Sequence, residues 1–181
     1  MAILPILEAP DARLKRVSEP VAEVTDAIRA LVADMFETMY AAPGIGLAAA
    51  QVDHPIRLLV MDLGDGPDDA EGNGTPNPRV FINPEILQAS EELGVFNEGC
   101  LSVPEQYAEV ERPARIRARW LDEQGDRHEQ ELDGLLATCL QHEIDHLDGI
   151  LFIDHLSRLK RNMLLKKLEK LRAEKSREEA A

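Results

Sequence analysis

The chain has 181 residues, 44% of them hydrophobic and 30% charged, which is enough for one compact domain with a sizeable core. Its formal net charge is −14 and it has only two cysteines, a composition that excludes a disulfide-rich secreted module and suits a reducing cytoplasm. No run approaches the length of a membrane span, and the opening stretch Met1–Pro5 has no targeting signal. We therefore expect a cytoplasmic protein, with neither a membrane nor free nucleic acid among its partners.

A first helix is predicted between Thr25 and Pro43. Thr25 is a typical N-cap, and apolar residues follow it at helical spacing: Ile28, Leu31, Val32, Met35, Phe36 and Met39. The glycine-rich run after Pro43, residues 44–51, contains a Gly-x-Gly-x-x-Ala pattern that formally resembles a dinucleotide-binding turn. Such a turn follows a strand and opens a helix, whereas this run follows a helix. The context therefore argues against nucleotide binding.

Four strands are predicted next, at residues 57–62, 80–86, 114–121 and 127–132, and together with the helices they indicate an α+β fold. The segment 64–78 is rich in Gly, Asp and Pro and is predicted to be a surface loop without calcium-binding spacing. Arginines alternate with apolar residues on the third strand, which predicts one buried and one solvated face. One of them is a candidate partner for Glu98 or Asp145: Arg115, Arg117 or Arg119.

The most informative segment is His142-Glu143-Ile144-Asp145-His146, in a helix predicted from Asp133 to a stop at Gly149. In H-E-x-x-H the two imidazoles lie about one helical turn apart and reach one metal ion. The carboxylate of Glu143 is then placed to act on a metal-bound water as a base. Leu135 and Cys139 lie on the same stripe of the helix, so the site is predicted to have an apolar approach.

A catalytic ion normally takes three protein ligands, so a third donor is required. The metzincin pattern is excluded because Phe152 stands where its third histidine belongs and His155 comes three residues too late. Cys139 lies seven residues before His146, about 10 Å of helical rise, and is too distant to share an ion with both histidines. We interpret Cys139 as a small buried apolar residue.

The remaining thiol is Cys100, in the segment Glu98-Gly99-Cys100-Leu101-Ser102. The sequence therefore predicts a metal site of one thiolate and two imidazoles: Cys100, His142 and His146. Glu98 is expected to hold the Cys100 segment by an ion pair, and Asp145 to orient a ligand from outside the coordination sphere. The other histidines stand outside this spacing and are predicted to be structural or exposed: His54, His128 and His155.

Three separated segments resemble the three signature motifs of the peptide deformylase family, in the family's order: residues 44–51, 98–102 and 141–146. The resemblance extends from the N-terminal Leu-Pro-Ile-Leu stretch to at least Phe152. It implies antiparallel or mixed sheets packed around a central helix that carries the H-E-x-x-H motif, followed by a C-terminal helix. It also implies removal of the formyl group from the N-terminal formylmethionine of new polypeptides. The metal implied is one Fe²⁺ per chain, with Zn²⁺, Ni²⁺ or Co²⁺ as substitutes.

The resemblance also assigns roles within the site. Glu143 is expected to transfer the proton, while the Gln51 side-chain amide and the Leu101 backbone N–H are expected to bind the formyl oxyanion. Gly44 and Gly46 are expected to let an extended peptide lie against their loop. The methionine pocket is predicted to be lined by Ile45, Leu101, Leu135 and Cys139. Tyr107 departs from the family, because many bacterial relatives have a basic residue at this position.

The C-terminal segment differs in charge from the rest of the chain. Residues 158–181 carry nine Lys or Arg and four Glu, a charge of +5, which leaves −19 on residues 1–157. Leucines and a methionine at helical spacing predict an amphipathic helix attached to a catalytic domain of residues 1–157. Two interpretations stay open for this tail: a terminal helix docked on the domain, or a ribosome contact driven by phosphate attraction, as in some bacterial deformylases.

Overall fold

The computed structural model describes residues 2–70 and 72–180. Its helices, with η for a 3-10 helix, are η1 (Ala12–Lys15), α1 (Asp26–Ala41), η2 (Ala49–Val52), α2 (Gly134–Leu147), η3 (Phe152–His155) and α3 (Arg158–Glu179). The strands are β1 (Gly46–Ala48), β2 (Leu58–Met61), β3 (Arg79–Ala89), β4 (Leu93–Cys100), β5 (Val103–Pro113), β6 (Arg115–Leu121) and β7 (Arg127–Asp133). None of the described helices is long and apolar enough to cross a bilayer.

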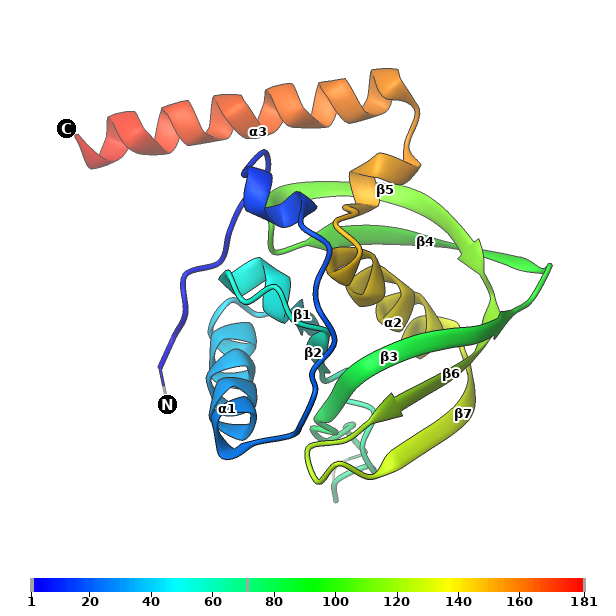
Figure 1. The fold of residues 1–181 in the computed structure, drawn as a ribbon. Helices are drawn as coiled ribbons and strands as arrows, with labels where there is room; N and C mark the ends of the chain where they lie inside the picture. Colours follow the sequence, from blue (N-terminus) through cyan, green and yellow to red (C-terminus); the bar gives the residue numbers. More distant parts are fainter. Residues whose placement is uncertain (1, 71, 181) are drawn as a thin grey trace.

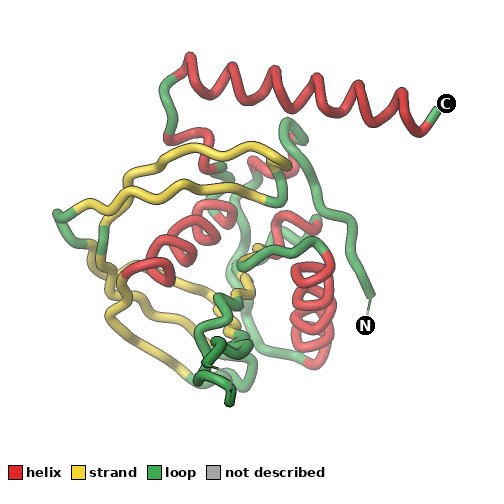
Figure 2. Tube along the Cα trace, turned by 180° about the vertical axis from the view of Figure 1, so that it is seen from behind, coloured by secondary structure: helices red, strands yellow, loops and turns green. Residues whose placement is uncertain are grey.

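Two antiparallel sheets enclose helix α2. One sheet has five strands in the order β1-β2-β3-β6-β7, and the other is the two-stranded hairpin β4-β5. Figure 1 shows α2 between the hairpin above it and the larger sheet, with α1 beside β1 and β2 and α3 lying across the top. The view from behind shows the same arrangement (Figure 2). The predicted α+β architecture around a central helix is therefore confirmed.

The termini of the two longer internal helices follow from local chemistry. The Thr25 side chain accepts a hydrogen bond from the Ile28 amide at 3.4 Å, as expected of an N-cap. Asp133 occupies the N-cap position of α2, although its side chain makes no capping hydrogen bond within the described part of the chain. At the other end Gly149 has a φ of 73°, and a Cβ there would lie 2.5 Å from the Lys15 carbonyl oxygen. Only glycine fits this stop.

The four predicted strands are present, but three others were not predicted. β1 is short, and the hairpin β4-β5 lies in a stretch without a clear apolar alternation. The positions of β5 that face inward include Gln106 and Arg112, which are buried, while its outward positions carry glutamates such as Glu109. Polar residues on the inner face remove the period-two signal that marks a strand. The sequence pattern therefore does not predict the hairpin, because polar residues occupy its inner face.

Three apolar clusters hold these layers together. Helix α2 packs its buried residues Leu140, Ile144 and Leu147 against the larger sheet, where Phe81 and Trp120 lie. Helix α1 covers β1 and β2 in a second cluster. The third cluster joins the N-terminal segment, the hairpin, η3 and α3. Because burying a large apolar side chain contributes about 1.5–3 kcal/mol, these clusters fix α2 between the sheets.

Candidate active site

The three predicted metal ligands come together from two elements. Cys100 is the last residue of β4, and His142 and His146 lie one turn apart on α2. Their donor atoms all lie within 4.8 Å of one another, and the Cys100 sulfur is 3.2 Å from His146 Nε2. Metal bonds of about 2.0–2.3 Å to nitrogen and sulfur fit a group of donors of this size. The thiolate and imidazole donors also suit a transition-metal ion.

Hydrogen bonding orients the first imidazole. The His142 Nδ1–H donates to Glu98 Oε1 at 2.8 Å, so its Nε2 lone pair is left for an ion beside Cys100. Burial lowers the pKa of His142, but hydrogen bonds to Cys100 and Glu98 raise it well above the ordinary value. Burial lowers the pKa of His146 well below it. Since metal ligands must be deprotonated, an ion that binds His142 would displace the proton favoured by this raised pKa.

Glu143 is a buried carboxylate with an unused acceptor. Its Oε2 atom has no hydrogen-bond partner within the described structure, and burial raises the pKa of the carboxyl to about 7. Its other oxygen, Oε1, packs closely against Gly46, because a Cβ on Gly46 would lie 2.5 Å from it. A buried, unpartnered carboxylate next to three metal-ligating atoms is what a base acting on bound water requires.

The Gln51 side chain is held between two segments. Its Oε1 accepts from the Ala48 amide at 2.9 Å, so its NH₂ group points the other way. That group donates to Ser102 Oγ at 3.0 Å and approaches the Cys100 sulfur at 3.6 Å. The amide is thus fixed as a donor toward the metal site. Leu101 follows Cys100 directly, and both residues line the same cavity.

A buried arginine that the sequence analysis missed supports this arrangement. Arg112 on β5 donates to both oxygens of Glu98, at 2.7 and 3.0 Å, and to Asp145 Oδ2 at 2.8 Å. Burial lowers its pKa, but the Glu98 and Asp145 contacts raise it above the ordinary value. The candidate arginines of β6 were wrong, because they pair with other glutamates: Arg115 with Glu92, Arg117 with Glu129 and Arg119 with Glu85.

Glu98 makes one contact more than predicted, and Asp145 acts on a ligand only indirectly. Glu98 forms the expected ion pair, but it also orients the ligand His142. The Asp145 carboxylate bonds Arg112 and His155, so within the described structure it reaches a ligand through Arg112 and Glu98. No local spacing marks Arg112: its inward position on β5, opposite Gly94 of β4, follows from the pairing of the two strands. A charged residue on an inward face needs a buried partner, and Glu98 was available.

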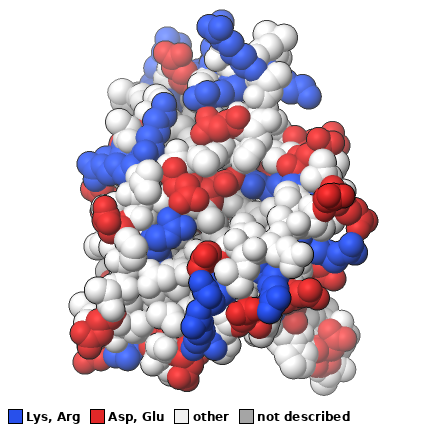
Figure 3. Space-filling view, turned by 45° about the vertical axis from the view of Figure 1, so that its right-hand side comes forward, with Lys and Arg blue, Asp and Glu red and all other residues white. Residues whose placement is uncertain are grey.

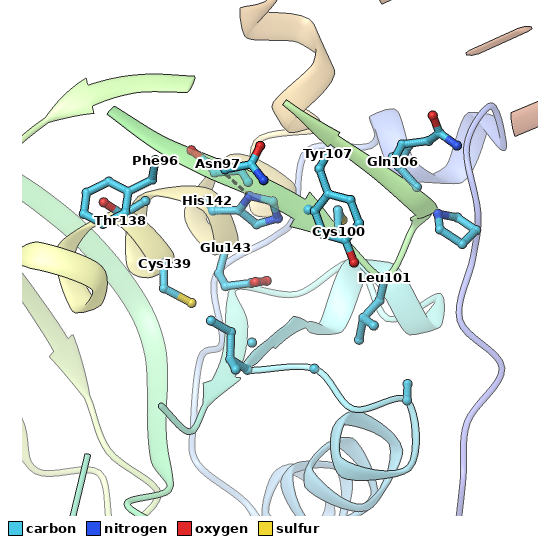
Figure 4. A pocket seen from close by; sticks show the side chains of 18 of the residues that line it. Phe96, Asn97, Cys100, Leu101, Gln106, Tyr107, Thr138, Cys139, His142 and Glu143 are labelled. Atoms are coloured by element: carbon cyan, nitrogen blue, oxygen red, sulfur yellow. Dashed lines mark hydrogen bonds and ion pairs between the residues drawn. The ribbon is translucent and has the colours of Figure 1, made fainter. Parts of the chain in front are cut away.

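A cavity of about 550 Å³ is lined by Glu143 and by two of the three ligands, Cys100 and His142. All five residues predicted to bind substrate line it: Gly44, Ile45, Gly46, Leu135 and Cys139. Cys139 is buried, whereas the Ile45 and Leu135 side chains are 47% exposed and therefore lie toward the mouth. The hairpin supplies walls that were not predicted, including Phe96. Figure 4 shows Cys139 and Thr138 on one side of His142 and Glu143, and Leu101 on the other.

Tyr107 stands over the metal side of the cavity (Figure 4). The residue lines the cavity and is 64% exposed, while its ring lies against Gly99, where a Cβ would come within 2.4 Å of it. The hairpin therefore needs glycine at position 99 to hold this ring. The ring gives this part of the cavity a flat, largely apolar surface.

Comparisons with known proteins agree with the geometry. The family model for polypeptide deformylase matches residues 3–162. Peptide deformylases from Rhizorhabdus wittichii and Novosphingobium aromaticivorans are 71% and 64% identical, over 95% of this chain and 97% and 98% of theirs. The crystal structure of a peptide deformylase from Legionella pneumophila has a TM-score of 0.86 at 43% identity, covering 97% of this chain and 99% of that one. That from Ehrlichia chaffeensis has a TM-score of 0.86 at 44% identity, covering 94% and 97%.

These matches extend over nearly the whole chain and include the segments that supply Gln51, Cys100 and the two histidines. The chain belongs to the peptide deformylase family, whose members are enzymes that remove the formyl group from an N-terminal methionine.

Proposed function

We propose that the chain deformylates the N-terminal formylmethionine of newly made polypeptides at the site built from Cys100, His142, His146 and Glu143. The observation that carries this assignment is the buried Glu143 carboxylate, whose Oε2 has no hydrogen-bond partner in the described structure and which lines the cavity together with the ligands Cys100 and His142. A site closed by a fourth protein ligand would have no use for such a group.

We propose Fe²⁺ as the resident ion, one per chain, with Zn²⁺, Ni²⁺ or Co²⁺ as substitutes. The family resemblance suggests iron, and the mixed sulfur and nitrogen donors are compatible with each of these ions. When bound, a divalent ion lowers the pKa of water and polarises the formyl carbonyl. We further propose a cytoplasmic location, because both cysteines are free thiols and a thiol ligand needs a reducing compartment.

Glu143 is the proton carrier in this scheme. Its pKa of about 7 lets it accept a proton from the attacking water near neutral pH and deliver that proton to the departing amine. The fixed NH₂ group of Gln51 and the Leu101 backbone N–H bind the oxyanion that develops on the formyl oxygen. Removing one such donor typically lowers kcat by about 10²–10³.

Substrate selection depends on the apolar part of the cavity. We propose that Cys139, Leu135 and Ile45 receive the methionine side chain, and that Gly44 and Gly46 let the extended peptide backbone lie close to Glu143. The support is their common position on the cavity wall. Burying the methionine side chain there contributes about 1.5–3 kcal/mol.

The decisive test combines metal analysis with product identification. Protein purified without oxygen should hold one metal ion per chain and release formate from formyl-Met-Ala-Ser. Glu143→Gln should keep the metal and lose about 10²–10⁴ in kcat, the usual contribution of a general base. Cys100→Ser should lose both the metal and the activity. A metallopeptidase would instead release a cleaved peptide, and a fully metallated, active Cys100→Ser variant would refute the site.

We also propose that the basic face of α3 contacts the ribosome, where nascent formylated chains emerge. Figure 3 shows Lys and Arg gathered at the top of the molecule, where α3 lies, above a surface of mixed charge. Lys160 and Lys167 are exposed on this helix.

The double alanine variant of Lys160 and Lys167 should co-sediment less with ribosomes, and its co-sedimentation should depend less on salt, while activity on short peptides stays unchanged. The double variant Arg115→Ala, Arg127→Ala makes the same charge change elsewhere and should behave as the unmodified chain.

A further inference from the structure

The short helix η3 lies directly against the support of a metal ligand. Its first residue, Phe152, is buried, and its ring stacks on the His142 imidazole with centroids 6.1 Å apart. Its last residue, His155, forms a hydrogen bond with the carboxylate of Asp145 on α2 at 2.7 Å. Phe152 and His155 are the two residues that do not fit the metzincin pattern for a third metal ligand. Both therefore contact the ligand His142 or its surroundings.

From His155 a continuous series of hydrogen bonds leads to the metal site. Asp145 Oδ2 accepts from His155 Nε2–H and, at 2.8 Å, from Arg112 Nη1. Arg112 donates through Nε and Nη2 to both oxygens of Glu98. Glu98 Oε1 in turn accepts from the His142 ring at 2.8 Å. Each step is a charge-assisted bond of good geometry, so the position of one member constrains the next.

The two inner members of this series are buried, whereas the two outer members, Asp145 and His155, are partly exposed. The side chains of Arg112 and Glu98 are 5% and 6% exposed, whereas those of Asp145 and His155 are 18% and 36% exposed. Because a guanidinium buried between two carboxylates keeps its place only while both are held, Asp145 must not rotate toward solvent. His155 binds the same oxygen, Asp145 Oδ2, that Arg112 binds, and it thereby ties this carboxylate to η3.

We propose that His155 is a positioning residue for the deformylase reaction, which holds the ligand His142 in place through Asp145, Arg112 and Glu98. His155 does not touch the substrate or the ion. Loss of such a partner outside the coordination sphere costs about 10–100-fold in metal affinity when it contacts the ligand itself, so at this remove we expect a smaller effect, about three- to tenfold. The inference rests on the proposed metal site.

The test uses Co²⁺-loaded protein, because cobalt reports its own ligand field. In His155→Leu the hydrogen bond to Asp145 is lost, so Co²⁺ should pass to a chelator about three- to tenfold faster, with a changed d–d absorption spectrum. The kcat should fall with KM unchanged, since the cavity wall is untouched. In His155→Gln the side-chain amide can still donate to Asp145, and the Co²⁺ release rate and spectrum should return toward those of the unmodified protein.

The chain offers a matched control for losing a surface histidine. His128 bonds Asp122 at 2.6 Å, and their side chains are 38% and 24% exposed, close to the values for His155 and Asp145. This pair lies at the β6–β7 hairpin, away from the ligands. His128→Leu should leave Co²⁺ release, spectrum and kcat as they are. A general loss of stability would change the release rate in both variants, whereas positioning changes it only in His155→Leu.

A double-mutant cycle decides whether His155 acts through Asp145. If it does, His155→Leu should add no further acceleration of Co²⁺ release to the Asp145→Asn variant. Additive effects, or a folded His155→Leu protein with the release rate and spectrum of the unmodified chain, would overturn the proposal. Failure of the unmodified chain to bind one Co²⁺ would instead refute the proposed metal site, so the two failures are distinguishable.

Discussion

Gly46 and Glu143 lie so close together that the identity of one residue decides the position of the other. A Cβ on Gly46 would come within 2.5 Å of Glu143 Oε1 and within 3.0 Å of its carboxyl carbon. The carboxylate is the mobile end of its side chain, so it would move away from the added carbon toward the cavity that it lines. A methyl group here would therefore displace the proton carrier while leaving the three metal ligands alone.

We expect Gly46→Ala to lower kcat by about 10²–10⁴, the usual contribution of a general base, without loss of bound metal. Steady-state kinetics and metal analysis on the same preparation measure both quantities. Gly94→Ala is the control, because the nearest atom to its added Cβ lies at 3.5 Å, an ordinary contact. An active Gly46→Ala enzyme would mean that Glu143 does not need its observed position.

Residues were predictable where the chemistry imposes a spacing in the sequence. The pair His142 and His146 follows from helical periodicity, and Cys100 follows because no other unassigned thiol remains. Arg112 has no such spacing. It lies 14 residues from Glu98 and 33 from Asp145, and only the pairing of β4 with β5 and their packing on α2 bring the three together. Contacts of this kind depend on strand register, which the local sequence does not specify.

At the scale of elements, a short hydrogen bond joins the end of α1 to the loop after β2. Tyr40 donates its hydroxyl to Asp62 Oδ2 at 2.5 Å, and Asp62 also accepts from the Gly64 and Asn77 amides at 2.9 Å. Burial raises the pKa of Asp62, but these hydrogen bonds lower it below the ordinary value. Burial and the Asp62 contact raise the pKa of Tyr40 from 10.0 to about 12.

Tyr40→Phe should therefore destabilise the protein by about 1 kcal/mol at neutral pH, a modest value because the tyrosine is half exposed. The depressed pKa of Asp62 means that its contribution is present above its ordinary value of 3.8 and is lost as the pH falls through the lower folded-state value. The raised pKa of Tyr40 means that its contribution is present below 10.0 and is lost as the pH rises toward about 12.

Urea denaturation of both proteins at pH 3, 7 and 11 measures this window. We expect the difference in unfolding free energy to be largest at pH 7 and to shrink at both extremes. A difference that stays constant over the three pH values would show that the phenol contributes through packing rather than through its bond to Asp62.

Helix α1 and helix α2 were predicted from their caps and apolar spacing, whereas the hairpin was not. In α1 the signal is local, because Thr25, the buried methionines and Pro43 all lie within the helix or within two residues of its ends. In β4 and β5 the inward residues serve the site: Cys100 and Glu98 from one strand, Arg112 from the other. Placing polar groups on an inner face removes the pattern by which a strand is recognised. The functional role of the hairpin is therefore the reason that its sequence does not resemble a strand.

At the scale of the whole molecule, the basic C-terminal helix and the acidic body are joined by apolar contacts. Leu168 is 2% exposed and belongs to a cluster with Leu7, Val103 and Phe152. The ion pairs that cross the same boundary are exposed, such as Arg172 with Glu8 at 3.0 Å, and pairs of this kind contribute at most about 1 kcal/mol. Apolar packing rather than charge attraction therefore docks α3.

From this packing we propose that α3 belongs to the catalytic domain and is not a detachable tail. Leu168→Ala should lower the unfolding free energy by about 2–5 kcal/mol, or Tm by roughly 4–20 °C for a chain of this length. Leu159 lies on the same helix but is 72% exposed, so Leu159→Ala should change the free energy by less than about 0.5 kcal/mol. A chain ending at residue 157 should melt at least as early as Leu168→Ala, because Val103 and Phe152 would then be exposed to water together. Equal melting of the shortened and full-length chains, measured by circular dichroism, would instead mean that α3 is held on the body by nothing but its charges.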